Sequence, residues 1–228
     1  MHGRSVIVTG AFGVLGSAVS AAFEREGYRV ARVDFATAPT NMESTGPIFG
    51  NVDLAVPGSA ERVVGDVERE LGGVDVVVNI AGGFLWETVA NGTIEGWKRM
   101  FETNALSAFA MCSAALPLLR LRPAARIINI GAAAALQATT GMAPYAASKA
   151  AVHRLTESLA AEVGGDDMTV NAILPSIIDT PGNRAEMRDA DYGKWVKPEK
   201  IAELALYLAS PAAGAVTGAL IPVTKGDG

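Results

Sequence analysis

Two residues in the second half of the chain have the types and spacing that acid–base chemistry requires. Tyr145 and Lys149 are four positions apart in a segment with helical periodicity, and residues at i and i+4 share one face of a helix. A phenol, with a pKa of about 10, is a poor acid–base catalyst at neutral pH. A neighbouring ammonium group favours the phenolate and lowers that pKa. The pair is therefore a candidate for proton transfer, provided that other elements bring a reactive ligand to it.

A second pattern, near the start of the chain, is typical of phosphate binding. Three glycines at intervals of three follow a buried strand at 4–9 and directly precede a helix. Such glycines permit a tight turn, close approach of a phosphate to backbone N–H groups and close packing of the helix on the strand. The helix N-terminus adds about half a positive charge. The residues that we expect to hold a dinucleotide pyrophosphate are Gly10, Phe12, Gly13, Val14, Leu15 and Gly16.

A carboxylate closes the second predicted strand. Asp34 can accept hydrogen bonds from the ribose hydroxyls of an adenosine and repels a 2′-phosphate, so NAD(H) is favoured over NADP(H). Arg32 lies on the opposite face if the strand alternates regularly, but a shifted register would aim it at a 2′-phosphate, which leaves NADP(H) open. Asp53 and Leu54, after the third strand, are further candidates for contact with the adenine edge.

The elements that must position these residues alternate along the chain. We predict strands at 4–9, 28–34, 48–52, 74–80, 125–130, 169–174 and 219–223, and helices at 15–27, 59–71, 93–119 (broken in its first third), 144–163 and 198–208. Apolar strands separated by helices indicate a parallel sheet covered on both faces. We therefore expect a single doubly wound Rossmann α/β domain over 1–228, with roughly seven parallel strands and a loop or lid at about 175–197. Its ligands bind at the carboxyl ends of the strands.

Composition narrows the class of protein. The chain has 228 residues, of which 50% are hydrophobic and 19% charged, so it can bury a large core. A net charge of −5 argues against nucleic-acid and anionic-membrane partners. The single cysteine, Cys112, excludes an intrachain disulfide, and with two histidines it gives no metal-site spacing. Without a leader or membrane span, we expect a soluble cytoplasmic protein.

Five ordered motifs give the chain a family resemblance. They are Thr9-Gly10 to Gly16, Asp75 to Gly82, Asn104, Tyr145 with Lys149, and Asn171 to Pro181. On these motifs the chain resembles the short-chain dehydrogenase/reductase family along nearly its whole length. The resemblance implies hydride transfer between a nicotinamide and a small carbonyl, alcohol or imine substrate, with Tyr145 as acid/base. It also implies a homodimer or homotetramer, with the Ala-rich faces at 105–115 and 146–161 compatible with close helix approach.

The resemblance assigns further roles to residues after the strands. It places Asn79, Ala81 and Gly82 beside the cofactor, and Asn104 at a water near Lys149 in a proton relay. The residues that it implies around the nicotinamide carboxamide are Pro175, the Ile178 main chain and Thr180.

Two positions depart from the family pattern. Val14 replaces a glycine of the phosphate turn, and Ala132 stands 13 residues before the tyrosine, where the family carries a substrate-orienting serine. A methyl group cannot hydrogen-bond a carbonyl oxygen, and losing one such donor costs about 10²–10³ in rate. Either the substrate does not need the hydroxyl, or activity is low, or another side chain replaces it. The candidates for that replacement are Gln137, Thr139 and Thr140.

The second half of the chain also resembles one branch of the family, the dihydropteridine reductases. The motifs are Ala81-Gly82-Gly83, Gly141-Met142, Ala151 to His153, Leu174 to Arg184, and Trp195. The branch implies NADH and a quinonoid dihydropterin, an electron-poor ring that accepts hydride readily without a hydroxyl donor. Trp86 is then a candidate for stacking on the ring, with Arg184 and Trp195 in the lid. The alternatives are a general ketone or alcohol oxidoreductase, and a cofactor-binding protein with little activity because of Ala132.

Overall fold

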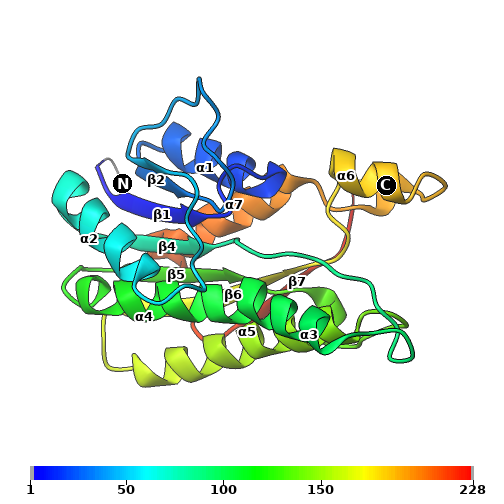
Figure 1. Cartoon of the computed structure of the whole chain (residues 1–228). Coiled ribbons are helices and arrows are strands. Elements are labelled where there is room, and N and C mark those ends of the chain that lie inside the picture. Colours follow the sequence, from blue (N-terminus) through cyan, green and yellow to red (C-terminus); the bar gives the residue numbers. More distant parts are fainter. Residues whose placement is uncertain (1–2, 227–228) are drawn as a thin grey trace.

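The computed structural model describes residues 3–226 and contains one seven-stranded sheet in the order β3-β2-β1-β4-β5-β6-β7 (Figure 1). All six neighbouring pairs are parallel. The strands are β1 Ser5–Thr9, β2 Arg29–Val33, β3 Ile48–Phe49, β4 Val76–Asn79, β5 Ala125–Ile130, β6 Met168–Pro175 and β7 Leu220–Val223. The predicted α/β fold is confirmed, and the weak third strand is shorter than its apolar run.

Helices cover both faces of the sheet. Those on one face are α1 Val14–Arg25 and α7 Pro198–Ala209, and those on the other are α2 Ser59–Leu71, α4 Ser107–Leu119 and α5 Ala143–Glu162 (Figure 1). Each face has its own apolar core, because strand side chains alternate between the two faces. The central strands are buried along their whole length, which explains their uninterrupted apolar runs.

The strand order reverses between β1 and β4, which are neighbours although two strands separate them in the chain. Ligands of doubly wound sheets bind outside the carboxyl ends of the strands at such a switch point. In this chain the turn after β1 and the segment after β4 meet there. The fold thereby brings the glycine turn close to residues that are about 70 positions later in the chain.

The helix predicted at 93–119 is irregular where the sequence suggested a break. Residues Ile94–Met100 form α3, residues Phe101–Leu106 form a π-helical turn, and α4 follows without a gap. Such turns re-aim one side chain within a helix and often occur at functional sites. Here the turn contains Asn104.

The segment predicted as a loop at 175–197 is more ordered than its composition suggested. It contains α6 Pro181–Glu186 and a short 3₁₀ turn, Tyr192–Lys194. Backbone hydrogen bonds of 2.8 Å from Asp179 to Val196 and 2.9 Å from Val196 to Ile177 tie its two limbs together. The segment projects beyond the sheet at the right of Figure 1, on the side to which the segment after β4 also extends.

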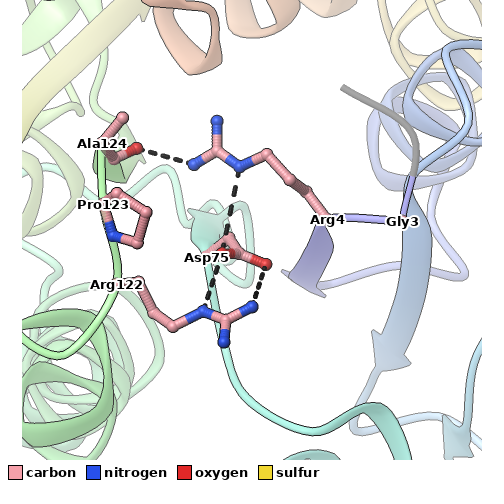
Figure 2. A pocket seen from close by; sticks show the side chains of 6 residues that line it. All are labelled: Gly3, Arg4, Asp75, Arg122, Pro123 and Ala124. Atoms are coloured by element: carbon pink, nitrogen blue, oxygen red, sulfur yellow. Dashed lines mark hydrogen bonds and ion pairs between the residues drawn. The ribbon is translucent and has the colours of Figure 1, made fainter.

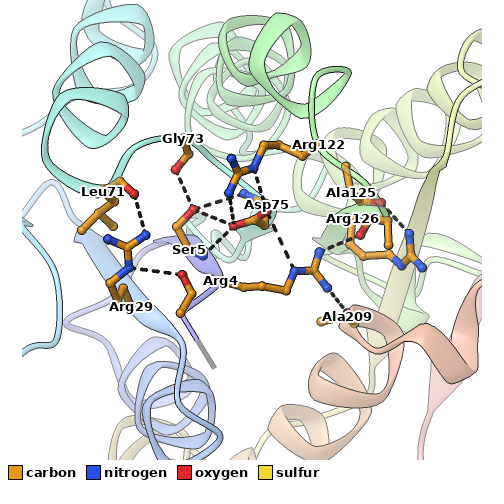
Figure 3. Close-up of polar contacts among 12 residues, drawn as sticks. Arg4, Ser5, Arg29, Leu71, Gly73, Asp75, Arg122, Ala125, Arg126 and Ala209 are labelled. Carbon is orange, nitrogen blue, oxygen red and sulfur yellow. Dashed lines mark hydrogen bonds and ion pairs between the residues drawn. The ribbon is translucent and has the colours of Figure 1, made fainter. Parts of the chain in front are cut away.

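A cluster of charged side chains around the buried Asp75 lies at the amino-terminal ends of β1 and β4. The Asp75 carboxylate accepts a hydrogen bond from Arg122 Nε at 2.8 Å, and Arg4 Nε lies 4.0 Å away (Figure 2). It also accepts a hydrogen bond from the Ser5 backbone N–H at 2.8 Å (Figure 3). Burial opposes ionisation of Asp75, but these hydrogen bonds outweigh it and lower its pKa. Around this cluster, arginines also bind backbone carbonyl groups (Figure 3). An open cavity of about 500 Å³ lies here, away from the switch point.

No helix in the described part of the chain, residues 3–226, is long and apolar enough to cross a bilayer. Within the same residues, no three His, Cys, Asp or Glu side chains gather as a metal site.

Candidate active site

The glycine turn after β1 packs closely against neighbouring backbone and leads into an uncapped helix. Gly10 has φ +64°, and a Cβ there would lie 2.9 Å from the backbone nitrogen of Ala81. A Cβ on Gly16 would overlap the Gly10 carbonyl group, so glycine is required for α1 to pack on β1. Helix α1 begins after Gly13 with no side-chain cap and no acidic residue in its first turn. Its first N–H groups therefore have no side-chain partner and fit a pyrophosphate.

Thr9 connects the two sides of the switch point. Its hydroxyl oxygen accepts hydrogen bonds from the backbone N–H groups of Ile80 (3.0 Å) and Ala81 (3.1 Å). The last residue of β1 thus fixes the segment after β4 against the glycine turn.

Asp34 lies beside the glycine turn at the end of β2. Its Oδ2 accepts a hydrogen bond from the Phe12 backbone N–H and its Oδ1 one from Ala36, both at 2.9 Å. Arg32 is buried and forms an ion pair with Glu24 of α1 at 2.9 Å. The regular alternation of β2 therefore holds, and the shifted register that would aim Arg32 at a 2′-phosphate is wrong.

The two candidates after β3, Asp53 and Leu54, lie in different environments. The Leu54 side chain is buried in the core between α2 and the sheet, so that only the backbone of this residue is left for the predicted contact with an adenine edge. Asp53 is exposed, and its carboxylate accepts a hydrogen bond from the Ala55 backbone.

Tyr145 and Lys149 lie on successive turns of α5, as predicted. Lys149 is buried and donates a hydrogen bond from Nζ to the Ile130 carbonyl at 2.8 Å; burial lowers its pKa to about 8. The Tyr145 ring meets Phe84 edge-on, with centroids 5.1 Å apart. Burial raises the pKa of Tyr145 to about 12. The expected lowering of this pKa by the neighbouring lysine is therefore corrected: desolvation of the phenolate dominates.

Asn104 and Lys149 converge on Gly82. A Cβ on Gly82 would lie 2.5 Å from Asn104 Oδ1 and 3.2 Å from Lys149 Nζ, so the position requires glycine. Asn104 Oδ1 accepts a hydrogen bond from the Gly83 N–H at 2.9 Å, and its Nδ2 donates to the Ser148 hydroxyl at 3.0 Å. The structure thus brings together residues that the sequence placed in one proton relay.

Asn79 links two strands to a helix beneath the switch point. Its side chain is buried and donates hydrogen bonds to Asn129 Oδ1 (2.9 Å) and Cys112 Sγ (3.3 Å). The amide therefore joins β4, β5 and α4, and the expected place of this residue beside a cofactor stays a prediction. Burial also raises the pKa of Cys112 to about 12, which keeps this thiol protonated and unreactive at neutral pH.

Two exposed aromatic residues follow β4. They are Phe84, which meets Tyr145, and Trp86, and they are 53% and 58% exposed. Trp86 Nε1 donates a hydrogen bond to the Thr140 carbonyl at 3.1 Å, and its ring covers Gly141, where a Cβ would overlap it. Sequence reasoning missed Phe84, although its position directly after the glycines that follow β4 was an available signal.

Ala132 is buried and extended at the end of β5, and its backbone N–H donates a hydrogen bond to His153 Nε2 at 3.3 Å. The possible replacements for the absent hydroxyl, Gln137, Thr139 and Thr140, are all exposed.

Two residues of the segment 175–197, Arg184 and Trp195, contact other residues of the same segment. Both nitrogens on one edge of the Arg184 guanidinium donate to Asp179, at 2.6 and 2.7 Å, and the group lies 4.8 Å from the Tyr192 ring centroid. Trp195 is 5% exposed and packs on Tyr192, with centroids 4.7 Å apart. Both side chains thus have partners within the 175–197 segment, and their expected contact with substrate stays a prediction.

The residues expected at a carboxamide follow β6, whose last residue is Pro175. The Ile178 carbonyl accepts a hydrogen bond from Asn183 Nδ2 at 2.7 Å, and the Thr180 hydroxyl caps α6 by accepting one from the Asn183 N–H at 3.1 Å. The polar atoms here are thus held in place by α6.

The sequence of the chain is similar to a family model and to known reductases and dehydrogenases. Residues 10–227 match the family model described as enoyl-(acyl carrier protein) reductase. The chain is 31% identical over 240 residues to a 3-oxoacyl-[acyl-carrier-protein] reductase of Vibrio cholerae, covering 99% of this chain and 98% of that protein. It is 31% identical over 237 residues to a meso-2,3-butanediol dehydrogenase of Serratia marcescens, covering 98% and 94%.

Solved structures of dehydrogenases share the fold of this chain. A short-chain dehydrogenase/reductase (glucose/ribitol dehydrogenase) of Brucella melitensis superposes with a TM-score of 0.88 at 26% identity, covering 98% of this chain and 96% of that one. The ligand-free aldohexose dehydrogenase of Thermoplasma acidophilum gives 0.89 at 25% identity, covering 99% and 94%. With the glycine turn and the convergence of Lys149 and Asn104 on Gly82, these matches show that the chain belongs to the short-chain dehydrogenase/reductase family of oxidoreductases.

Proposed function

We propose that this oxidoreductase is an NADH-dependent reductase of an electron-poor conjugated ring of the quinonoid dihydropterin type. A nicotinamide dinucleotide supplies the hydride when bound, and the side chains described above supply the proton and the geometry. Two observations carry the substrate class: the exposed Phe84 ring that meets Tyr145 edge-on, and buried Ala132 where the family carries a hydroxyl.

Tyr145 is the proposed proton donor. A pKa of about 12 keeps the phenol protonated at neutral pH, which is the form that a reduction requires. Lys149 holds the junction of α5 with β5 and supplies positive charge below its pKa of about 8. Asn104, held by Gly83 and Ser148, positions the segment beside Lys149 where a relay water would sit.

Asp34 is the proposed determinant of NADH preference. Its carboxylate is fixed against the glycine turn by Phe12, and a 2′-phosphate there would meet like charge. Arg32 is committed to Glu24, and the stretch 35–40 contains no lysine or arginine to neutralise a phosphate.

The substrate assignment is tested by following NADH oxidation with a quinonoid dihydropterin and with a panel of ketones and 3-oxoacyl thioesters. Preferential turnover of the pterin supports the proposal, and preferential turnover of a ketone or thioester overturns it. A second candidate, a general carbonyl reductase, is supported by the names of the relatives. For that candidate Ala132→Ser should raise ketone turnover, whereas pterin turnover should not depend on the hydroxyl.

We also propose a homodimer or homotetramer that pairs the outer faces of α4 and α5. Leu106, at the end of the π-helical turn, and Phe109 of α4 are 47% and 54% exposed on this side of the sheet. Large apolar side chains exposed close together often mark a protein–protein interface. Light scattering of the purified protein tests the assembly, and Phe109→Glu should dissociate it.

A further inference from the structure

Three residues on one face of α5 are spaced by four: Tyr145, Lys149 and His153. The second and third both hold the end of β5. Lys149 donates to the carbonyl of Ile130, and two residues later the N–H of Ala132 donates to His153 Nε2 at 3.3 Å. The chain segment 130–132 is therefore attached to α5 at two points, one turn of helix apart.

The His153 ring is a neutral acceptor in this contact. It is 1% exposed, and burial, together with the charges of Arg154 and Lys149, lowers its pKa to about 4. Because Nε2 accepts a hydrogen bond, the proton of the neutral ring is on Nδ1.

The neighbouring residue makes room for the ring. A Cβ on Gly131 would lie 2.5 Å from His153 Nε2 and 3.2 Å from Leu174 Cδ1. The glycine at 131 and the histidine at 153 therefore fit together, and a side chain at 131 would displace the contact with Ala132.

We propose that His153 is a positioning residue that fixes the backbone of Ala132, so that this position offers a substrate neither a side-chain hydroxyl nor a free backbone N–H. Both backbone polar groups of Ala132 are engaged, its N–H by His153 and its carbonyl by the Ala135 N–H at 3.1 Å. The proposed proton donor that remains is Tyr145, on the same face of α5 as His153. The inference rests on the proposed role of Tyr145, and it extends the substrate class to acceptors that need a single donor, such as a conjugated ring or imine.

The test compares two variants of the full-length protein. His153→Leu fills the site with a side chain of comparable size but removes the hydrogen-bond acceptor, whereas His153→Gln retains an acceptor of similar reach. We expect His153→Leu to lower kcat on the best substrate about tenfold to a hundredfold, because small misplacements at a reacting centre have such effects. NADH affinity should stay within about twofold, and His153→Gln should recover most of the rate. Ser158→Ala, on the exposed side of α5, is the control. Equal losses in the two folded variants, or unchanged kcat in His153→Leu, would overturn the proposal.

A second measurement does not depend on the substrate. Nitrogen-15 NMR of the imidazole should show an unprotonated Nε2 and a neutral ring between pH 5 and 8, in keeping with a pKa of about 4. A ring with its proton on Nε2, or one charged at neutral pH, would contradict the inference even if the pterin assignment holds. Conversely, failure of pterin turnover leaves this result to decide the role of His153 by itself.

Discussion

The ammonium group of Lys149 donates a hydrogen bond to the carbonyl oxygen of Ile130 at 2.8 Å. This contact joins α5 to the carboxyl end of β5, at the edge of the sheet where the glycine turn and Asn104 also lie. One buried cation thus has a structural partner and a position in the candidate relay, and its desolvation is the cost of that position.

Tyr145→Phe should remove the proton donor without removing the cofactor site. Loss of a positioned acid or base lowers turnover by about 10²–10⁴. The ring contact with Phe84 does not need the hydroxyl, so the fold and NADH affinity should persist. Steady-state kinetics with fluorescence titration of NADH measure both. Turnover near that of the parent protein would show that another group protonates the substrate.

Lys149→Met should abolish turnover and raise stability. The folded-state pKa is about 8, below the ordinary 10.5, so charging this lysine opposes folding, by up to about 3 kcal/mol. Between these two pH values the unfolded chain binds more protons than the folded one, so the parent protein gains stability as pH rises. The free energy of unfolding of the parent protein, measured with urea, should therefore fall furthest below that of the variant at pH 7, and the difference should shrink towards pH 10.5. Lys98→Met, at an exposed lysine of α3, is the control; a pH-independent difference would contradict the assignment.

Asp34→Ala should relax cofactor choice. Removing the carboxylate removes both the repulsion of a 2′-phosphate and the hydrogen bonds to ribose hydroxyls. We expect the ratio of kcat/KM for NADH over NADPH to fall at least about tenfold. Glu70→Ala, at an exposed carboxylate of α2, should leave the ratio unchanged. A preference for NADPH in the parent protein would contradict the proposed role of Asp34.

Asp75→Asn should destabilise the protein through the edge of the sheet away from the candidate site. Breaking a buried ion pair costs about 3–5 kcal/mol, because the remaining charge is left uncompensated, and here Arg122 and Arg4 lose their carboxylate. Asp66→Asn, in an exposed pair with Arg69, should change the free energy of unfolding by less than about 1 kcal/mol.

The pH dependence provides a further check on this cluster. The pKa of Asp75 is lowered in the folded state, so its contribution is present above the ordinary carboxylate pKa and is lost as pH falls through the folded value. The difference between the parent protein and Asp75→Asn should therefore shrink in acid. A difference that grows with acid would contradict the ion pair.

The sequence by itself determined the order of strands and helices, the glycine turn and the shared helix face of Tyr145 and Lys149. These features depend on local periodicity and on backbone conformations that glycine permits, and both can be read within a short window of sequence. The doubly wound parallel sheet inferred from these elements also predicted that the site would lie at the carboxyl ends of the strands.

Tertiary structure alone decided which partner each polar side chain takes. Asn79 bonds to Asn129, Arg184 bonds to Asp179, and Ala132 gained a partner in His153. A buried polar group takes whichever donor or acceptor packing brings within reach, because leaving it unpaired is costly. That choice depends on elements tens of residues apart in the chain, which no local pattern records.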